Sequence, residues 1–334
     1  MQAFVRHFGI SLLLSLLVCG VSVRYLGLSA LWPLLILIVI EIVFSFDNAI
    51  VNAKILGRLS PFWQNMFLTV GIVIAIFGMR LLFPIVIVAL AAHLSLGSVW
   101  ELALHHPHQY ADKLGLAHPL IAAFGGAFLL ILTLDFFLNG THRVLWIGRL
   151  EKRLRHLGTW WSPALISVVV VVASALLSHE HTGQIIRAGL LGVVTFLAMH
   201  LLTKLLGRNQ PAGQHVTGWA AFSLFMYLQV LDASFSFDGV IGAFAITDVV
   251  VLIAAGLGIG ALWVRSMTVY MVRRGTLDAY RYLEHGAYYT IAVLAVALFI
   301  SLFVEVPDAI TGLIGVGIIG SAIVSSIEAR KQRA

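Results

Sequence analysis

Apolar residues fill long stretches of this chain, and short polar segments separate one stretch from the next. An α-helix needs about 20 residues to cross the hydrocarbon core of a bilayer. Ten apolar runs approach or exceed that length: residues 8–27, 31–54, 66–92, 118–138, 163–178, 185–206, 217–244, 248–272, 286–304 and 309–327. Such long runs indicate membrane helices rather than strands. The pattern therefore predicts an all-α polytopic membrane protein with about ten transmembrane helices.

Composition supports the same fold class. Of the 334 residues, 60% are hydrophobic and only 11% are charged, and the mean hydropathy is +0.99. About a quarter of the residues in an ordinary soluble domain are charged, so that class is excluded. The single cysteine, Cys19, excludes a disulfide framework. Nucleotide-binding and zinc-protease signatures are absent from the sequence, and we therefore expect neither an enzyme nor a bound cofactor.

The first run, residues 8–27, follows Arg6 and His7 and has two interpretations. A secretory signal peptide combines a basic start and an apolar segment with a cleavage site of small residues. That cleavage pattern does not follow cleanly here, and Val18-Cys19 is a poor lipoprotein signal. We therefore expect a retained transmembrane helix.

Lysine and arginine are distributed unevenly between the two sides that this pattern predicts. If the N-terminus is cytoplasmic and ten helices alternate, the far side holds only Arg24, Lys113 and Arg187. Arg80 and Arg265 lie within helices, and the other 16 of the 21 basic residues fall on the cytoplasmic side. Basic residues concentrate on the cytoplasmic side of membrane proteins. We therefore expect a multi-pass protein of the cell inner (plasma) membrane with both termini cytoplasmic, and no nucleic acid as a partner.

One tetrapeptide occurs twice, each time inside an apolar run. The sequence Phe-Ser-Phe-Asp occupies residues 44–47 and 235–238, and a second acid, Glu41 or Asp232, lies six residues before each aspartate. Ionisable residues are expensive in hydrocarbon, so acids at this depth indicate a functional site. The competing interpretation is a chance match of polar residues that pack helices. Because both the tetrapeptide and the acid spacing recur, we favour the functional site.

Helical geometry adds neutral oxygens to the four acids. At about 100° per residue, Ser45 and Asn48 share a stripe with Glu41, and Ser236 shares one with Asp232. The motif aspartates point about 120° away from their own stripes, so an unwound turn near each Ser-Phe-Asp is needed for the acids to converge. Discontinuous helices of this kind form ion sites in many transporters. The predicted metal ligands are Glu41, Ser45, Asp47, Asn48, Asp232, Ser236 and Asp238.

The two motifs also predict a symmetry. The motif helices are the second and the seventh of ten, so they run in opposite directions, and residues 1–157 and 158–334 would form an inverted repeat. Each half carries an arginine in the helix after its motif, Arg80 or Arg265. The arginines either neutralise buried carboxylates structurally or take a direct part in transport, and the two roles are compatible.

Three further residues stand out in the apolar runs. Asp135 lies near the predicted cytoplasmic end of the fourth run. It is either a third site acid or part of an exit path, or it is a polar residue at a helix end in the membrane interface, where the cost of a charge is lower. Gly256 and Gly260 are four residues apart in the eighth run. They share a helix face, which predicts close packing against another helix.

The motif residues resemble those of the TerC superfamily of integral membrane proteins. The shared pattern is an acid followed by Ser-x-Asp in one helix and repeated in the other half, here at residues 41–48 and 232–239. Residues 243–247, Ala-Phe-Ala-Ile-Thr, are similar to the sequence that follows the second motif of that family. The two helix arginines are similar as well, and residues 281–289 resemble a bacterial branch of the superfamily. The likeness covers the motif helices and their successors.

This resemblance implies manganese efflux, with a link to tellurite resistance. The chain departs from the family pattern at Gly239, where a polar residue is common, and in the additional acid Asp135. Both departures bear on the substrate more than on the fold.

The leading hypothesis is a secondary transporter that exports a divalent cation, with Mn²⁺ as the leading candidate. The lipid bilayer is its other expected partner. Carboxylate, hydroxyl and amide oxygens are hard ligands that suit Mg²⁺, Ca²⁺ or Mn²⁺ better than Cu⁺ or Zn²⁺. One alternative is a membrane accessory protein that loads metal onto exported proteins or acts in tellurite resistance. Another is an intramembrane aspartyl protease, and the absence of a Gly-x-Gly-Asp pattern around Asp238 argues against it.

Overall fold

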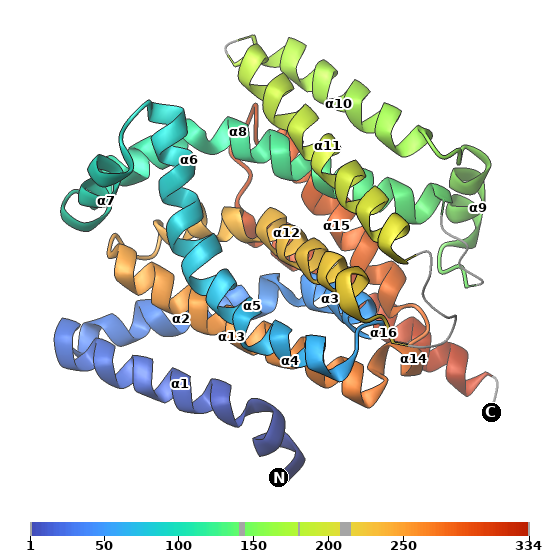
Figure 1. Ribbon diagram of the computed structural model, residues 1–334, viewed down its shortest axis with the longest axis horizontal. Helices are drawn as coiled ribbons and strands as arrows, with labels where there is room; N and C mark the ends of the chain where they lie inside the picture. The colour runs from blue at the N-terminus through green and yellow to red at the C-terminus, as the bar shows by residue number, and fades with distance from the viewer. Residues whose placement is uncertain (1, 140–143, 180, 208–214, 333–334) are drawn as a thin grey trace. The chain divides into compact units, whose positions relative to one another are not determined.

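Every regular element in the described part of the chain is a helix, as the computed structural model shows (Figure 1). The structure describes residues 2–139, 144–179, 181–207 and 215–332, apart from the side chains of residues 2–7, 236–238, 241, 278 and 308. Two compact units are present, each assembled from separate stretches: Met1–Ala117 with Phe225–Arg274, and His118–Leu224 with Gly275–Ala334. The halves that the sequence predicts, residues 1–157 and 158–334, are the two copies of an inverted repeat and not compact units. The inverted repeat therefore stays a prediction.

The first unit carries both copies of the repeated tetrapeptide. The helices that lie wholly within it are α1 (Gln2–Leu26), η1 (Leu28–Ala30), α2 (Leu31–Phe44), α3 (Phe46–Leu56), α4 (Pro61–Leu68), α5 (Val70–Val73), η2 (Ile74–Leu82), α6 (Phe83–Ala92), α7 (Leu96–His105) and α13 (Val250–Arg274). Two longer helices, α8 (Pro107–Leu134) and α12 (Gly218–Ala243), contribute residues to both units.

The second unit contains the basic helix α9. Its other helices are η3 (Asp135–Asn139), α10 (Ser162–Ser178), α11 (Thr182–Gly207), α14 (Thr276–Ala279), α15 (Leu283–Ile300) and α16 (Asp308–Lys331), and α9 itself spans Gly148–His156. The buried acid Glu151 fastens α9 to its surroundings, because its carboxylate accepts hydrogen bonds from the Ile147 N–H and the Tyr289 hydroxyl, both at 3.1 Å. Glu151 thus holds together residues that are 138 positions apart.

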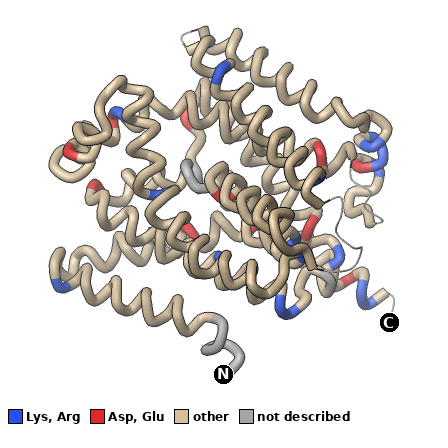
Figure 2. The backbone as a smooth tube through the Cα atoms, viewed as in Figure 1, with Lys and Arg blue, Asp and Glu red and all other residues tan. Residues whose placement is uncertain are grey.

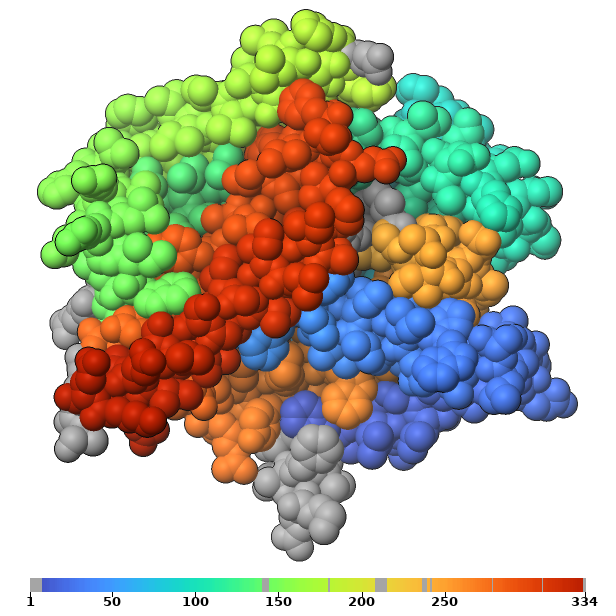
Figure 3. Space-filling model, turned by 180° about the vertical axis from the view of Figure 1, so that it is seen from behind, coloured from blue at the N-terminus to red at the C-terminus, as the bar shows by residue number. Residues whose placement is uncertain are grey.

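The helices have the length and the exposed apolar surface of membrane spans. Within the described residues, seven helices are long and apolar enough to cross a membrane, or eight if the bent pair Leu28–Phe44 and Phe46–Leu56 forms one span. Positions of charged residues are sparse along the helices (Figure 2). Figure 3 shows α16 (red) at the surface, and its Leu313 is 69% exposed. The chain is therefore an all-α membrane protein, and the count of about ten spans stays a prediction.

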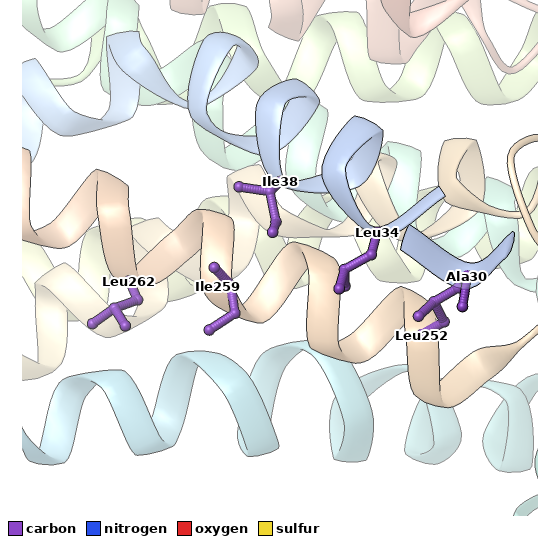
Figure 4. Packing of buried hydrophobic residues seen from close by; sticks show 6 residues of the cluster. All are labelled: Ala30, Leu34, Ile38, Leu252, Ile259 and Leu262. Carbon is purple, nitrogen blue, oxygen red and sulfur yellow. The ribbon is translucent and has the colours of Figure 1, made fainter. Parts of the chain in front are cut away.

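The packing of α2 against α13 forms the centre of the first unit. Ala30, Leu34 and Ile38 face Leu252, Ile259 and Leu262 in one buried cluster (Figure 4). The predicted close approach at the α13 glycines is confirmed, because a Cβ at Gly256 would lie only 2.6 Å from Leu37 Cβ. A Cβ at Gly260 would lie 2.6 Å from Cγ of Glu41. These glycines bring the backbone of α13 against the helix that carries the first motif acid.

The first motif breaks its helix, as the sequence predicts. The helix α2 ends before Ser45, which has φ −98° and ψ 14°, and the axis turns by 54° into α3. The N–H of Asn48 donates to Oδ1 of Asp47 at 2.8 Å. That carboxylate lies in the first turn of α3, where a negative charge is favoured by the helix dipole. Asp47 therefore stabilises the start of the second half-helix.

The matching break in the second motif is not present, and that expectation was wrong. The helix α12 runs without interruption through Gly239 to Ala243. Glycine permits an unwound turn but does not force one. In apolar surroundings an uninterrupted helix satisfies its own backbone hydrogen bonds, so the continuous helix is the default.

A π-helical turn, η2, lies just before Pro84, which is near the start of α6. The N–H of Phe83 bonds to the carbonyl of Gly78, five residues back. Proline lacks an N–H, and its ring collides with the carbonyl four residues earlier, which is that of Arg80. A widened turn relieves that collision, and π-turns inside helices occur often at functional sites. The turn contains Arg80, the predicted supporting arginine.

Candidate metal site

Two buried acids, one from each motif, are paired with the two helix arginines. Glu41 on α2 accepts a hydrogen bond from Nη2 of Arg80, and Asp232 on α12 accepts one from Nη2 of Arg265. All four residues are at most 9% exposed. Each motif therefore supplies one acid, and the helix segment after each motif supplies the arginine that neutralises it.

The two ion pairs share a small cavity inside the first unit. It measures about 10 Å³, which is close to the space that one water molecule needs. The lining residues come from both motifs and from the helices that follow them: Glu41, Ser45, Asn48, Arg80, Asp232, Phe235, Ala261, Val264 and Arg265. The structure thus brings six of the predicted site and supporting residues around one space.

Asn48 joins the two motifs directly. Its Nδ2 donates to Oδ1 of Asp232 at 2.7 Å, across 184 positions of sequence. Its own Oδ1 is buried and accepts no hydrogen bond from any described residue. Buried polar atoms are nearly always satisfied, so an orphaned acceptor at a cavity needs an explanation. A cation in the cavity would supply one.

Ser45 and Glu41 act together at the helix break. The Ser45 hydroxyl donates to Oε1 of Glu41 at 3.1 Å, on the same oxygen that receives Arg80. Oε2 of Glu41 accepts no hydrogen bond within the described side chains. Glu41 therefore keeps one oxygen available for a ligand.

Asp47 is buried, at 3% exposure, but does not line the cavity. Its described partner is the N–H of Asn48, and none of the ion pairs among the described residues includes it. The turn at Ser45 therefore does not bring Asp47 to the cavity that Glu41 lines. Ser236 and Asp238, the second copy's serine and motif aspartate, have side chains that lie outside the described residues.

Asp135 belongs to the second unit and is not a lining residue of this cavity. It lies at the start of the π-turn η3, where its Oδ1 accepts a hydrogen bond from Asn139 at 3.0 Å. Nδ1 of His200 lies 3.9 Å from its other carboxylate oxygen, and both side chains are partly exposed. Asp135 therefore has polar partners of its own, and both interpretations of this residue stay predictions.

Sequence reasoning missed the residues that hold Arg265. Gln229 is 2% exposed, and its Oε1 accepts a hydrogen bond from Arg265 at 3.1 Å. The carbonyl of Phe67 accepts a second at 3.2 Å, and the guanidinium carbon lies 4.3 Å from the centre of the Phe67 ring. One signal was present in the sequence: Gln229 is a polar residue three positions before Asp232 in an apolar run.

This arrangement is suited to a small, hard cation. The cavity offers carboxylate, hydroxyl and amide oxygens, the donor set that Mg²⁺, Ca²⁺ and Mn²⁺ prefer. The described residues that line the cavity include no histidine or cysteine, which are the ligands that favour softer metals. The described residues hold no cluster of three or more His, Cys, Asp or Glu side chains placed to bind a metal together. A cation here would therefore rely on neutral oxygens as well as on acids.

Comparison with known proteins assigns the chain to a family. Neither the curated proteins nor the solved structures contain a match. One family model, described as "Protein of unknown function (DUF475)", matches residues 46–333. The matched region starts within the first motif and includes the second motif, both arginines and the second unit up to residue 333. Because that match covers most of the 334 residues, the chain belongs to the DUF475 family.

Proposed function

We propose that this protein is a secondary transporter that exports a divalent cation across the inner membrane, with Mn²⁺ as the leading candidate. The observation that carries the proposal is the meeting of Glu41 and Asp232 around a cavity the size of one water molecule. Buried acids in a membrane protein mark ion pathways, and these two come from copies of one motif. The likeness of the motif helices to the TerC superfamily supports manganese in particular.

The charge balance supports exchange of a cation for protons. Four acids belong to the two motifs, and two arginines neutralise Glu41 and Asp232. Each uncompensated acid at the middle of a membrane costs at least about 2.5 kcal/mol. Two arginines cannot balance four acids, and one divalent cation or two protons would supply the two further positive charges. Protonation releases a bound metal because ligands bind in their ionised form.

Purified protein in proteoliposomes tests this function. Flux is measured with Mn²⁺, Ca²⁺, Mg²⁺ and Zn²⁺ in parallel, with an opposing proton gradient. We expect Mn²⁺ flux above protein-free vesicles and little Zn²⁺ flux. A metal-loading accessory protein would bind Mn²⁺ without moving it, and an aspartyl protease would do neither.

Asparagine substitutions test whether the motif aspartates take part. Asp47→Asn and Asp238→Asn keep the side-chain shape and remove one charge each. Both are expected to abolish Mn²⁺ binding and flux, because the negative charge that balances the cation is lost, while the protein still inserts and purifies. If both variants transport Mn²⁺ at the parental rate, the motif aspartates are not needed and the charge balance proposed above is wrong.

A further inference from the structure

The two arginines neutralise equivalent acids but are held in different ways. Arg80 and Arg265 each donate Nη2 to a motif acid, Glu41 or Asp232. A carboxylate that holds a guanidinium on one oxygen binds a divalent cation less well, because the two positive charges repel each other at short range. Any cation that enters the cavity therefore competes with an arginine.

Arg265 is fixed in place by four contacts with three residues. Besides Asp232, it contacts the carbonyl of Phe67, Oε1 of Gln229 and the Phe67 ring. A Cβ at Gly71 would collide with its Nη1, so the surrounding backbone closes on the guanidinium. These contacts would all have to break for Arg265 to leave Asp232.

Arg80 has fewer restraints. Apart from Glu41, its described hydrogen-bond partner is the carbonyl of Ala75, at 3.0 Å from Nη1. Ala75 lies in the same π-turn as Arg80 itself. Because donor and acceptor belong to one helical segment, this hydrogen bond need not break when the guanidinium leaves Glu41.

We infer that Arg80 is a tethered counter-ion of Glu41 which the transported cation displaces, whereas Arg265 is a positioning residue that stays on Asp232. The inference rests on the proposed transport of a divalent cation and assigns the arginines their separate parts in it. When the cation leaves, Arg80 returns, so Glu41 is not left as an unpaired buried charge, which is strongly destabilising. The site thereby alternates between two neutralised arrangements, and the cation shifts the balance by binding only one of them.

The test compares Arg80→Gln with the matched variant Arg265→Gln. The full chain is reconstituted in lipid nanodiscs, and Mn²⁺ binding is followed by the electron paramagnetic resonance signal of free Mn²⁺. Arg80→Gln removes the competitor and should bind Mn²⁺ at least tenfold more tightly than the parental protein, with slower release in a flux assay. Arg265→Gln also removes a positive charge, but it leaves Asp232 without the group that positions it, and this loss should outweigh the gain, so the variant should bind Mn²⁺ no more tightly than the parental protein. Arg80→Lys keeps a positive charge without the planar guanidinium fork; it should insert normally and bind a few-fold more tightly.

Each result decides a separate point. If the parental protein binds Mn²⁺ and neither Arg80 variant binds it more tightly, Arg80 is not a competitor, and the inference is overturned while the proposed function stands. Equal tightening by Arg265→Gln would overturn the distinction between the two arginines. Parental protein that binds none of the four divalent cations would overturn the proposed function itself, together with the inference.

Discussion

The packing of α13 against Glu41 makes a sharp prediction about Gly260→Ala. The new methyl group would lie 2.6 Å from Cγ of Glu41, closer still to Cβ of Glu41, and 3.1 Å from the carbonyl oxygen of Ile38. The backbone of α2 fixes the positions of that Cβ and of the carbonyl oxygen, so a change of the Glu41 rotamer cannot make room. The substitution therefore pushes α2 away from α13 at the position of the motif acid.

The expected magnitudes separate stability from binding. Overpacking typically costs about 1–3 kcal/mol, and alanine gains about 1 kcal/mol over glycine in a helix. The net loss of stability is then about 0–2 kcal/mol. Opening the contact from 2.6 Å to an ordinary 3.4 Å moves the acid by up to 0.8 Å. Metal-ligand distances tolerate only about 0.2 Å, so Mn²⁺ affinity should fall at least tenfold.

Gly256→Ala is the matched control. Its methyl group would meet Leu37 Cβ at 2.6 Å, on the same helix interface but one turn from Glu41. Both variants are purified, and thermal stability is measured beside Mn²⁺ binding. We expect similar small losses of stability, with a large loss of binding only in Gly260→Ala. Parental Mn²⁺ affinity in Gly260→Ala, or an equal loss in Gly256→Ala, would refute the role of this contact.

Three further predictions concern orientation, the link between the motifs and the second unit. A cysteine at position 108, where the His108 side chain is 82% exposed, should react with a thiol reagent added outside cells, and a cysteine at the exposed position 152 should not. The reverse labelling pattern would contradict the proposed cytoplasmic termini. Asn48→Ala removes the donor to Asp232 and one amide oxygen, so Mn²⁺ binding should weaken at least tenfold, and parental affinity would show that the amide is not a ligand. Tyr289→Phe removes a hydrogen bond to the buried Glu151 and should lower the free energy of unfolding by about 1.5–3 kcal/mol. Thermal unfolding is compared with that of the control Tyr25→Phe, because Tyr25 is 80% exposed, and equal stability of the two variants would contradict this prediction.

The sequence alone determined that this is an all-α membrane protein, and it singled out buried charges for the candidate site. Apolar runs of spanning length leave the backbone no partner but itself, so the helices follow from composition and length. The cost of burying charge singles out Glu41, Asp232 and the two arginines within those runs. The sequence also predicts the break at Ser45, yet the same tetrapeptide in α12 leaves its helix intact, so neighbouring residues alone do not decide where a helix breaks.

The tertiary structure decided which of those residues meet. Arg80 reaches Glu41 across 39 positions, and Asn48 reaches Asp232 across 184. Three of the helices that carry these residues, α2, α3 and η2, pack against α13, and no local pattern specifies which side chains such packing aligns. The same packing leaves Asp47 outside the cavity and surrounds Arg265 with partners that Arg80 lacks. Local sequence fixes where charges are buried, but their partners depend on distances that only the packed helices set.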